Sequence, residues 1–198
     1  MKQAVSKERW AHAQTAEKPH HLYESVNDSY KRYSFFYENY FRYLNINPDL
    51  NNKSIIEVGP ARIAGLLFCK NYSKSYIVEP IVFEETNYLY ENLNIEFIRS
   101  SLEKSELPHV DEIWLLNVLQ HVQDPDLFVE KCKESANTIK FFEPINTPID
   151  DPHPHTFTID DYKHYFGDCV QHYKEAISAF HGAECAYGVY HKDKAISK

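Results

Sequence analysis

A short segment near the first third of the chain combines a glycine turn with two carboxylates. Glu57 lies two positions before Gly59, and Glu79 lies twenty positions after it. An apolar run at Ser54–Val58 precedes the turn, a helical pattern at Arg62–Asn71 follows it, and a second apolar run ends at Glu79. Glycine allows a ligand to approach the backbone, and a carboxylate at the end of the second strand can accept hydrogen bonds from ribose hydroxyls. The pattern predicts a β-turn-α-β unit that binds an adenosine-containing ligand.

Other polar or small residues lie where later apolar runs end. Ser101 and Leu102 follow the third run, Asn117 follows the fourth, and Glu143 ends the fifth. The carboxyl ends of parallel strands meet at one edge of a doubly wound sheet, where ligands bind. The sequence therefore predicts a single ligand site at that edge.

Strands and helical patterns alternate from residue 54 onward, which is typical of an α/β fold. The last two runs are joined by a loop of about eight residues, which is too short for a helical crossover, so that pair is expected to be antiparallel. We predict a doubly wound, mainly parallel seven-stranded sheet with a C-terminal antiparallel strand pair. The expected strands are Ser54–Val58, the run ending at Glu79, Ile95–Ile98, Asp111–Leu116, Thr138–Phe142, Cys169–Ala176 and Glu184–His191.

Two later helices carry clear end signals. Asp124 followed by Pro125 predicts an N-cap and a helix that runs to about Ser135. Thr158, with Asp161 in the capping-box position, predicts a second helix that Gly167 ends. A further helix is expected between about 82 and 92, and one helical turn within 100–109.

The N-terminal part of the chain predicts two helices. Trp10, Ala13, Gln14 and Glu17 follow helical spacing, and Pro19 is expected to end that helix. A second helix, from about 26 to 44, carries a dense aromatic stripe that either packs against the core or forms a lid whose tyrosine hydroxyls, including that of Tyr37, face a ligand. We predict a helical segment over 1–45 and a ligand-binding core over 46–198.

The composition excludes several classes of protein. The 198 residues fit one domain, and a formal charge of −8 without a basic run argues against nucleic-acid binding. The four cysteines are far apart and form no C-x-x-C pair, which is typical of reduced thiols in the cytoplasm. We also expect no signal peptide and no membrane span, because no sufficiently long apolar run is present.

The motifs around these strands resemble those of class I S-adenosylmethionine-dependent methyltransferases. IIEVGPARIAG resembles the first motif of that family, and YIVEP resembles the second. SSLEKSELPHVDEIWLLNVLQHVQDP is similar to the stretch that carries the third and fourth motifs. The resemblance covers residues from about 54 to 191, and the N-terminal W-x-x-A-Q-x-x-E also resembles segments that precede the core in some small-molecule methyltransferases.

The resemblance implies S-adenosylmethionine as the cofactor and a role for each matching residue. Glu57 would hold the methionine ammonium, Gly59 and Ala61 would let the backbone approach the cofactor, and Glu79 would bind the ribose hydroxyls. The remaining implied contacts are Ser101 and Leu102 beside the adenine and Asn117 near the methionine part.

The turn after Gly59 departs from the family pattern. Alanine stands at 61 and 64, where glycine is common, and alanine restricts positive φ and adds a methyl group. A dinucleotide site would need G-x-G-x-x-G, and the buried Glu57 would repel a pyrophosphate. The acidic residue suits the cationic end of S-adenosylmethionine, so we expect methyl transfer rather than nicotinamide binding.

Three histidines are candidate catalytic bases for removing a proton from the methyl acceptor, because imidazole titrates near neutral pH. His121 follows the fourth strand, and His153 and His155 lie on the loop after the fifth. Each also fits a structural role, and His153 with His155 could be read as a metal pair, but no third ligand follows from their spacing, so no metal is predicted. Glu143 and Tyr37 are the expected contacts of the acceptor.

The sequence therefore predicts a small cytoplasmic enzyme that methylates oxygen or nitrogen of a small molecule, with no nucleic-acid or membrane partner. The alternative is a protein that keeps the fold and the cofactor but has lost turnover and acts as a binding or regulatory module. The altered glycines at 61 and 64 favour that alternative, and the histidines on the acceptor loop favour the enzyme.

Overall fold

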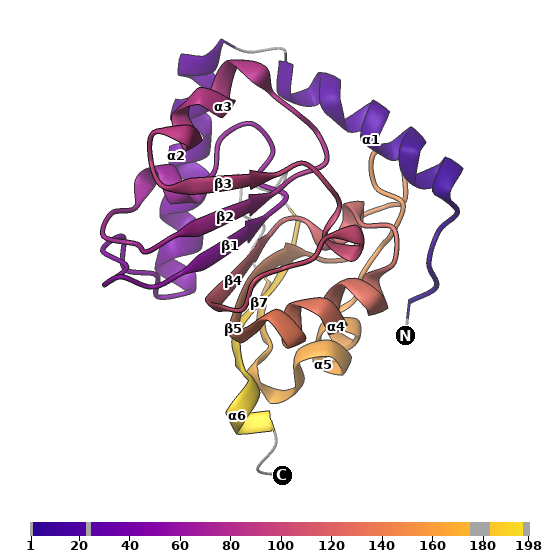
Figure 1. Cartoon of the computed structure of the whole chain (residues 1–198). Helices are drawn as coiled ribbons and strands as arrows, with labels where there is room; N and C mark the ends of the chain where they lie inside the picture. The colour runs from indigo at the N-terminus through magenta and orange to yellow at the C-terminus, as the bar shows by residue number, and fades with distance from the viewer. Residues whose placement is uncertain (1, 23–24, 175–182, 196–198) are drawn as a thin grey trace.

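The computed structural model describes all residues except 1, 23–24, 175–182 and 196–198 (Figure 1). Its centre is a seven-stranded sheet with the strand order β3-β2-β1-β4-β5-β7-β6. The first five strands run parallel, and β7 pairs antiparallel with both β5 and β6. The predicted fold class is thus confirmed. The strands are β1 (Ile55–Val58), β2 (Ser75–Val78), β3 (Ile95–Ile98), β4 (Val110–Leu116), β5 (Ala136–Pro144), β6 (Gln171–Tyr173) and β7 (Cys185–His191).

Helices cover both faces of the sheet (Figure 1). Aromatic residues of α2 pack on one face, and α4 and α5 pack on the other. The α-helices are α1 (Lys7–Leu22), α2 (Val26–Tyr43), α3 (Glu84–Glu91), α4 (Pro125–Ser135), α5 (Ile159–Phe166) and α6 (Lys192–Ala195). The short 3₁₀ turns are η1 (Gly65–Phe68), η2 (Leu102–Lys104), η3 (Leu119–His121) and η4 (Gly167–Cys169).

Strand β1 shows how the sheet divides its side chains between these two layers. Ile56 and Val58 pack in the cluster beneath α4 and α5, whereas Ile55 packs in the cluster beneath α2. Successive side chains of a strand point to opposite faces. Glu57 therefore faces α2, and its carboxylate meets the hydroxyl of Tyr37.

The helix expected at Arg62–Asn71 does not form, and the prediction is wrong there. The segment contains only the single turn η1. The Glu57 carboxylate accepts the backbone N–H groups of Gly65 and Leu66, which would otherwise bond within a helix. A methyl group at Gly65 would lie 2.5 Å from the Tyr37 ring, so α2 comes too close for a bulkier turn. Tertiary contacts therefore override the local helical pattern.

Helix α1 does not end at Pro19 but continues to Leu22, so this prediction is also wrong. Pro19 removes one backbone donor from the helix. Contacts on both sides stabilise the last turn: His21 Nε2 lies 2.7 Å from Glu17 Oε1, and the Tyr33 hydroxyl lies 2.9 Å from His21 Nδ1. These contacts stabilise the helical turn that follows the proline.

The predicted helix ends agree with the structure elsewhere. Asp124 caps α4 by accepting the N–H of Leu127, and Thr158 and Asp161 form the capping box of α5. Gly167 ends α5 with a positive φ of 68°. The strand expected at 169–176 is shorter, because η4 occupies its start, and residues 175 and 176 lie outside the described part.

Helix α2 is part of the same core as the sheet. Tyr37 and Phe41 of α2 are buried in one cluster with Ile55 and Trp114. The division into 1–45 and 46–198 stays a prediction. Among the described residues, none of the helices combines the length and the apolar character needed to cross a bilayer.

Candidate functional site

Three buried glutamates at the carboxyl ends of strands hold the loops around the predicted site. Glu57 of β1 accepts hydrogen bonds from Gly65 N (2.8 Å), Leu66 N (3.0 Å) and the Tyr37 hydroxyl (2.6 Å). All three bonds favour the charged carboxylate, but burial outweighs them and raises the pKa of Glu57. The carboxylate fixes the loop that follows β1.

Glu143 and Glu79 do the same for neighbouring loops. Glu143 accepts the N–H groups of Val118 and Leu119 at 2.9 and 3.1 Å, and burial raises its pKa to about 8. Glu79, directly after β2, accepts the N–H groups of Ile81 at 2.8 Å and Ala61 at 3.0 Å. Burial raises its pKa to about 7, against the effect of those two bonds.

A cavity of about 1160 Å³ lies where these loops meet. It reaches from the ends of β1, β2 and β4 to α1, α2 and the loop after β5. Nine of the residues singled out from the sequence line it: Tyr37, Gly59, Ala61, Glu79, Ser101, Leu102, Asn117, His121 and His153. The parallel topology therefore brings most of the predicted site together.

Glu57, Glu143 and His155 do not contribute to this lining. The two glutamates direct their oxygens to backbone N–H groups and, for Glu57, to Tyr37. His155 is buried, and its Nε2 lies 3.1 Å from the carbonyl oxygen of Val122. The contacts predicted for these three residues with cofactor or acceptor stay predictions.

The turn after β1 takes the conformation that a glycine-rich motif would take. Gly59 and Ala61 have φ of 61° and 55°, in the left-handed region. A Cβ at Gly59 would lie 2.5 Å from Val118 Cγ2, so glycine is needed here for packing as well as for backbone conformation. Ala61 adopts the same region despite its Cβ, because its N–H is held by Glu79. The alanine therefore preserves the turn.

Ala61→Gly is expected to raise the free energy of unfolding by about 1 kcal/mol. Left-handed backbone costs an L-residue roughly 1–2 kcal/mol, and the greater freedom of glycine in the unfolded chain cancels part of this gain. Urea denaturation would measure the change. Ala64→Gly is the matched control: Ala64 has φ of −80° and is fully buried, so this change should destabilise the protein. A lower free energy of unfolding for Ala61→Gly would contradict the interpretation that the left-handed backbone at Ala61 is strained.

Ser101 is the one residue of this group whose polar atom has no partner among the described residues. Its Oγ is buried and makes no hydrogen bond, although Ser101 lines the cavity. Leu102 beside it is buried and apolar. A buried hydroxyl without a partner costs free energy, and a ligand that bonds to it would offset that cost.

Asn117 ends β4 with φ of 65°, a conformation that asparagine tolerates better than most residues. Its backbone N–H donates to the carbonyl oxygen of Phe142, and its side-chain oxygen accepts a bond of 3.0 Å from Gln120. The turn carries the chain from β4 directly into η3. His121, the last residue of η3, is thereby placed at the cavity wall.

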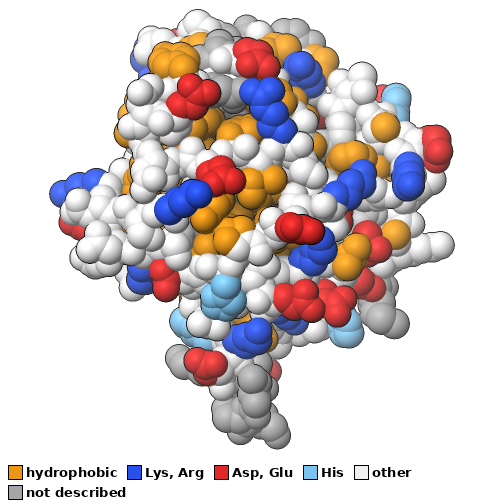
Figure 2. All heavy atoms as spheres, viewed as in Figure 1, with side chains coloured by type: hydrophobic (Ala, Val, Ile, Leu, Met, Phe, Trp, Pro, Cys, Tyr) orange, Lys and Arg blue, Asp and Glu red, His pale blue; other side chains and the backbone are white. Residues whose placement is uncertain are grey.

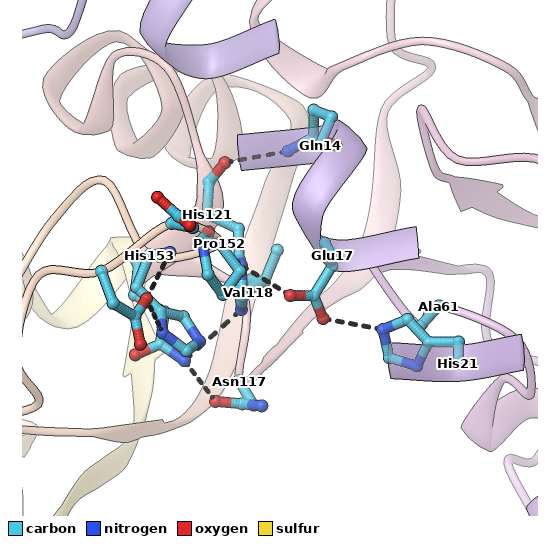
Figure 3. Close-up of polar contacts among 12 residues, drawn as sticks. Gln14, Glu17, His21, Ala61, Asn117, Val118, His121, Pro152 and His153 are labelled. Carbon is cyan, nitrogen blue, oxygen red and sulfur yellow. Dashed lines mark hydrogen bonds and ion pairs between the residues drawn. The ribbon is translucent and has the colours of Figure 1, made fainter. Parts of the chain in front are cut away.

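At the cavity wall, the tilted rings of His121 and His153 lie beside each other and near Glu17. The two imidazole rings have centroids 4.7 Å apart, and Glu17 lies between His21 and His121 (Figure 3). His121 Nδ1 lies 3.1 Å from the carbonyl oxygen of Pro152, and His153 Nδ1 lies 2.7 Å from Asp150 Oδ1. Burial lowers the pKa of His121 to about 4, although Glu17 acts in the opposite direction. His121 is therefore a neutral imidazole near pH 7.

Helix α1 supplies residues that the sequence did not identify as part of the site. Trp10 Nε1 and Gln14 Nε2 both donate to the carbonyl oxygen of His121, at 3.1 and 3.3 Å. Glu17 and His21 follow one and two turns later and line the cavity. The signal was available in the W-x-x-A-Q-x-x-E spacing, which places Trp10, Gln14 and Glu17 on one helix face. What they would face could not be read from it.

Comparisons with known proteins bear on the fold. No protein-family model matches the chain, and no curated protein matches its sequence. Among solved structures, it is similar to a Burkholderia thailandensis 1,6-didemethyltoxoflavin-N1-methyltransferase with bound S-adenosylhomocysteine. That match has 10% identity and a TM-score of 0.66, and covers 97% of this chain and 92% of that one.

Two further structures extend the similarity. The magnesium protoporphyrin IX methyltransferase of Synechocystis, solved with bound SAM, matches at 11% identity and a TM-score of 0.64, over 96% of this chain and 100% of that one. A SAM-dependent methyltransferase from Aquifex aeolicus matches at 16% identity and a TM-score of 0.55, over 77% and 88%. The chain has the fold of the class I S-adenosylmethionine-dependent methyltransferases.

Proposed function

We propose that this chain is a cytoplasmic enzyme that transfers a methyl group from S-adenosylmethionine to oxygen or nitrogen of a small molecule. The observation that carries the proposal is the cavity at the carboxyl ends of the strands, which Glu79 and Ser101 line with buried polar groups. Its volume of about 1160 Å³ exceeds that of most single-ligand pockets and suits a cofactor together with an acceptor. Similarity to methyltransferases across nearly the whole chain supports the same reaction.

The residues present fit the adenosine part of the cofactor. Each oxygen of Glu79 accepts one backbone N–H, which leaves further lone pairs for ribose hydroxyls. The unmatched Oγ of Ser101 offers a polar contact and Leu102 an apolar surface beside it. Gly59 and Asn117 border the same space, and both have left-handed backbone.

Ser101→Ala is expected to weaken binding of S-adenosylhomocysteine about three- to tenfold while leaving the ligand-free protein as stable as before or slightly more stable. The affinity loss is the net value of one hydrogen bond, and the stability follows from removing a buried hydroxyl that has no partner. Calorimetric titration and urea denaturation measure the two effects. Ser105→Ala is the control, because the Ser105 hydroxyl donates to the carbonyl oxygen of Ser101 at 2.9 Å. Its loss should lower the free energy of unfolding and leave the affinity for S-adenosylhomocysteine unchanged. An unchanged affinity of Ser101→Ala for S-adenosylhomocysteine would show that Ser101 does not contact the ligand.

S-adenosylmethionine supplies an activated methyl group on sulfur, and the chain must align an acceptor atom behind it. Alignment and exclusion of water are the main contributions expected of the protein. Trp10, Tyr33 and Phe36 give the acceptor end aromatic walls, and Tyr37 lines the same cavity. His121 and His153 remain the proposed catalytic residues, because they are the imidazoles among the three predicted that line this space.

A small molecule is favoured over a nucleic acid as the acceptor. On the face drawn in Figure 2, hydrophobic side chains gather near the centre, and acidic and basic side chains are interspersed around them. Phosphate backbones bind to continuous basic surfaces, and the described residues on this face form none.

The alternative is a binding module without turnover, and the short turn η1 in place of a helix after β1 favours it. A screen with methyl-labelled S-adenosylmethionine against hydroxyl- and amine-bearing small molecules distinguishes the two. Transfer of label that S-adenosylhomocysteine inhibits supports the enzyme. Tight binding of S-adenosylhomocysteine without transfer to any acceptor supports the module.

A further inference from the structure

Three segments far apart in the sequence bring metal-ligand side chains to one point of the cavity wall. Glu17 comes from α1, His121 from η3 and His153 from the loop after β5. One ligand atom from each lies within 4.8 Å of the other two (Figure 3). All three side chains are partly buried, so they are accessible from the cavity yet held in place.

The separation between Glu17 and His121 fits two ligands of a single ion better than a direct bond. Glu17 Oε2 lies 3.8 Å from His121 Nδ1. That distance is too long for a hydrogen bond. Two metal bonds of about 2.1 Å each allow their ligand atoms to lie up to about 4.2 Å apart, so one ion can bridge this gap.

Outer partners already orient two of the three ligands. His21 Nε2 holds Glu17 Oε1 at 2.7 Å, which turns Oε2 toward His121. Asp150 Oδ1 holds His153 Nδ1 at 2.7 Å, which leaves the other imidazole nitrogen available. Such hydrogen bonds fix the ring orientation and tautomer of metal ligands.

The carbonyl oxygen of Pro152 is the competing partner of His121. It lies 3.1 Å from the same Nδ1, so a protonated Nδ1 donates to it. When Nδ1 is unprotonated it binds an ion instead, and the Pro152 oxygen is then near enough to serve as a further ligand. The same geometry therefore accommodates a hydrogen-bonded histidine without the ion and a metal ligand with it.

We propose that Glu17, His121 and His153 bind one divalent transition-metal ion, such as Zn²⁺, at the cavity wall. Two imidazoles and one carboxylate select such ions over Mg²⁺ and Ca²⁺, which prefer oxygen ligands. The sequence predicts no metal here, because the third ligand lies more than a hundred residues from the histidines. That the ion binds the acceptor oxygen or nitrogen rests on the proposed methyl transfer, whereas ion binding itself does not.

Titration of untagged, metal-free protein with CoCl₂, followed by visible absorption and calorimetry, tests the site. One equivalent of Co²⁺ is expected to bind, and Zn²⁺ should displace it. Glu17→Gln and His153→Gln should each weaken binding by more than about tenfold, since even loss of an outer partner costs that much. The matched controls, Glu8→Gln and His12→Gln, change the same charges on exposed residues of α1 and should bind like the wild type.

Two results would overturn the proposal. One is the absence of Co²⁺ binding to folded wild-type protein. The other is equal weakening in the variants and their controls, which would place the ion elsewhere. Binding of S-adenosylhomocysteine by the same samples is measured in parallel. A protein that binds S-adenosylhomocysteine but no Co²⁺ rejects the metal site alone, and one that binds Co²⁺ but no S-adenosylhomocysteine rejects the proposed function alone.

Discussion

Glu57→Ala is expected to lower the free energy of unfolding by about 3–5 kcal/mol. The substitution leaves the N–H groups of Gly65 and Leu66 without an acceptor inside the core, and the Tyr37 hydroxyl keeps only its weaker bond of 3.1 Å to the carbonyl oxygen of Ile63. Each buried donor left unpaired costs roughly 1–3 kcal/mol. Urea denaturation of the wild type and the variant measures the difference.

Glu96→Ala is the matched control for this change. Glu96 is an exposed glutamate of β3 that pairs with Lys74 on the surface. Such pairs contribute about 0–1 kcal/mol, so the control should stay close to the wild type. If Glu57→Ala were as stable as Glu96→Ala, the loop after β1 would not depend on the buried carboxylate.

His153→Ala is expected to slow methyl transfer by about 100-fold to 10,000-fold, which is the usual contribution of a general base; where the proposed ion is bound, the loss comes from removing one of its ligands instead. His153 pairs with Asp150, whereas Glu79 holds the N–H groups of Ala61 and Ile81, so affinity for S-adenosylhomocysteine should stay within about twofold. The measurement is the initial rate with an acceptor from the labelled-methyl screen, with calorimetry for the affinity.

His12→Ala serves as the control for His153→Ala. His12 is an exposed imidazole on α1 that pairs with Asp151, on the same loop as His153, and does not line the cavity. Its loss should leave the rate unchanged. Equal rates for His153→Ala and wild type would show that His153 is structural.

The sequence predicted elements whose signals are local. The strand β3 agrees at both ends, and the caps at Asp124 and Thr158 form as expected. Parallel topology then requires the strand ends to converge, which is why Glu79, Ser101 and Asn117 reach one cavity. These conclusions depend on residues close in sequence and on general rules of sheet topology.

Features that depend on distant contacts were missed. The 62–71 segment has a helical pattern, yet Glu57 and Tyr37 occupy its N–H groups and its space. The oxygens of the buried Glu143 hold the turn after β4, a contact that the sequence did not predict, and its contact with the acceptor stays a prediction. In both cases the decisive partner lies more than five residues away, and only the folded chain identifies it.

The same limit explains the acceptor end of the site. Glu17 lies on the predicted helix and His21 lies beyond its predicted end at Pro19, so the contacts of Glu17 with His21 and His121 could not be foreseen. His155 shared its prediction with His153, two positions away, but the chain turns its imidazole to the carbonyl of Val122. A difference of two residues in a loop decides which ring reaches the cavity.

Calorimetric titration with S-adenosylhomocysteine at pH 6 and pH 8 tests whether the cavity binds the cofactor through Glu79. Burial raises the pKa of Glu79 to about 7, and the ionised carboxylate is the better acceptor for ribose hydroxyls. The ionised fraction of Glu79 is therefore about tenfold lower at pH 6 than at pH 8, and S-adenosylhomocysteine should bind about tenfold more weakly at pH 6.

The wild type is expected to bind in the micromolar range at pH 8, with affinity falling toward pH 6. Glu79→Gln should bind about 1–3 kcal/mol more weakly at pH 8 and lose the pH dependence, because its amide does not titrate. No heat of binding to the folded wild type would contradict the account. So would a Glu79→Gln variant with the affinity and pH dependence of the wild type.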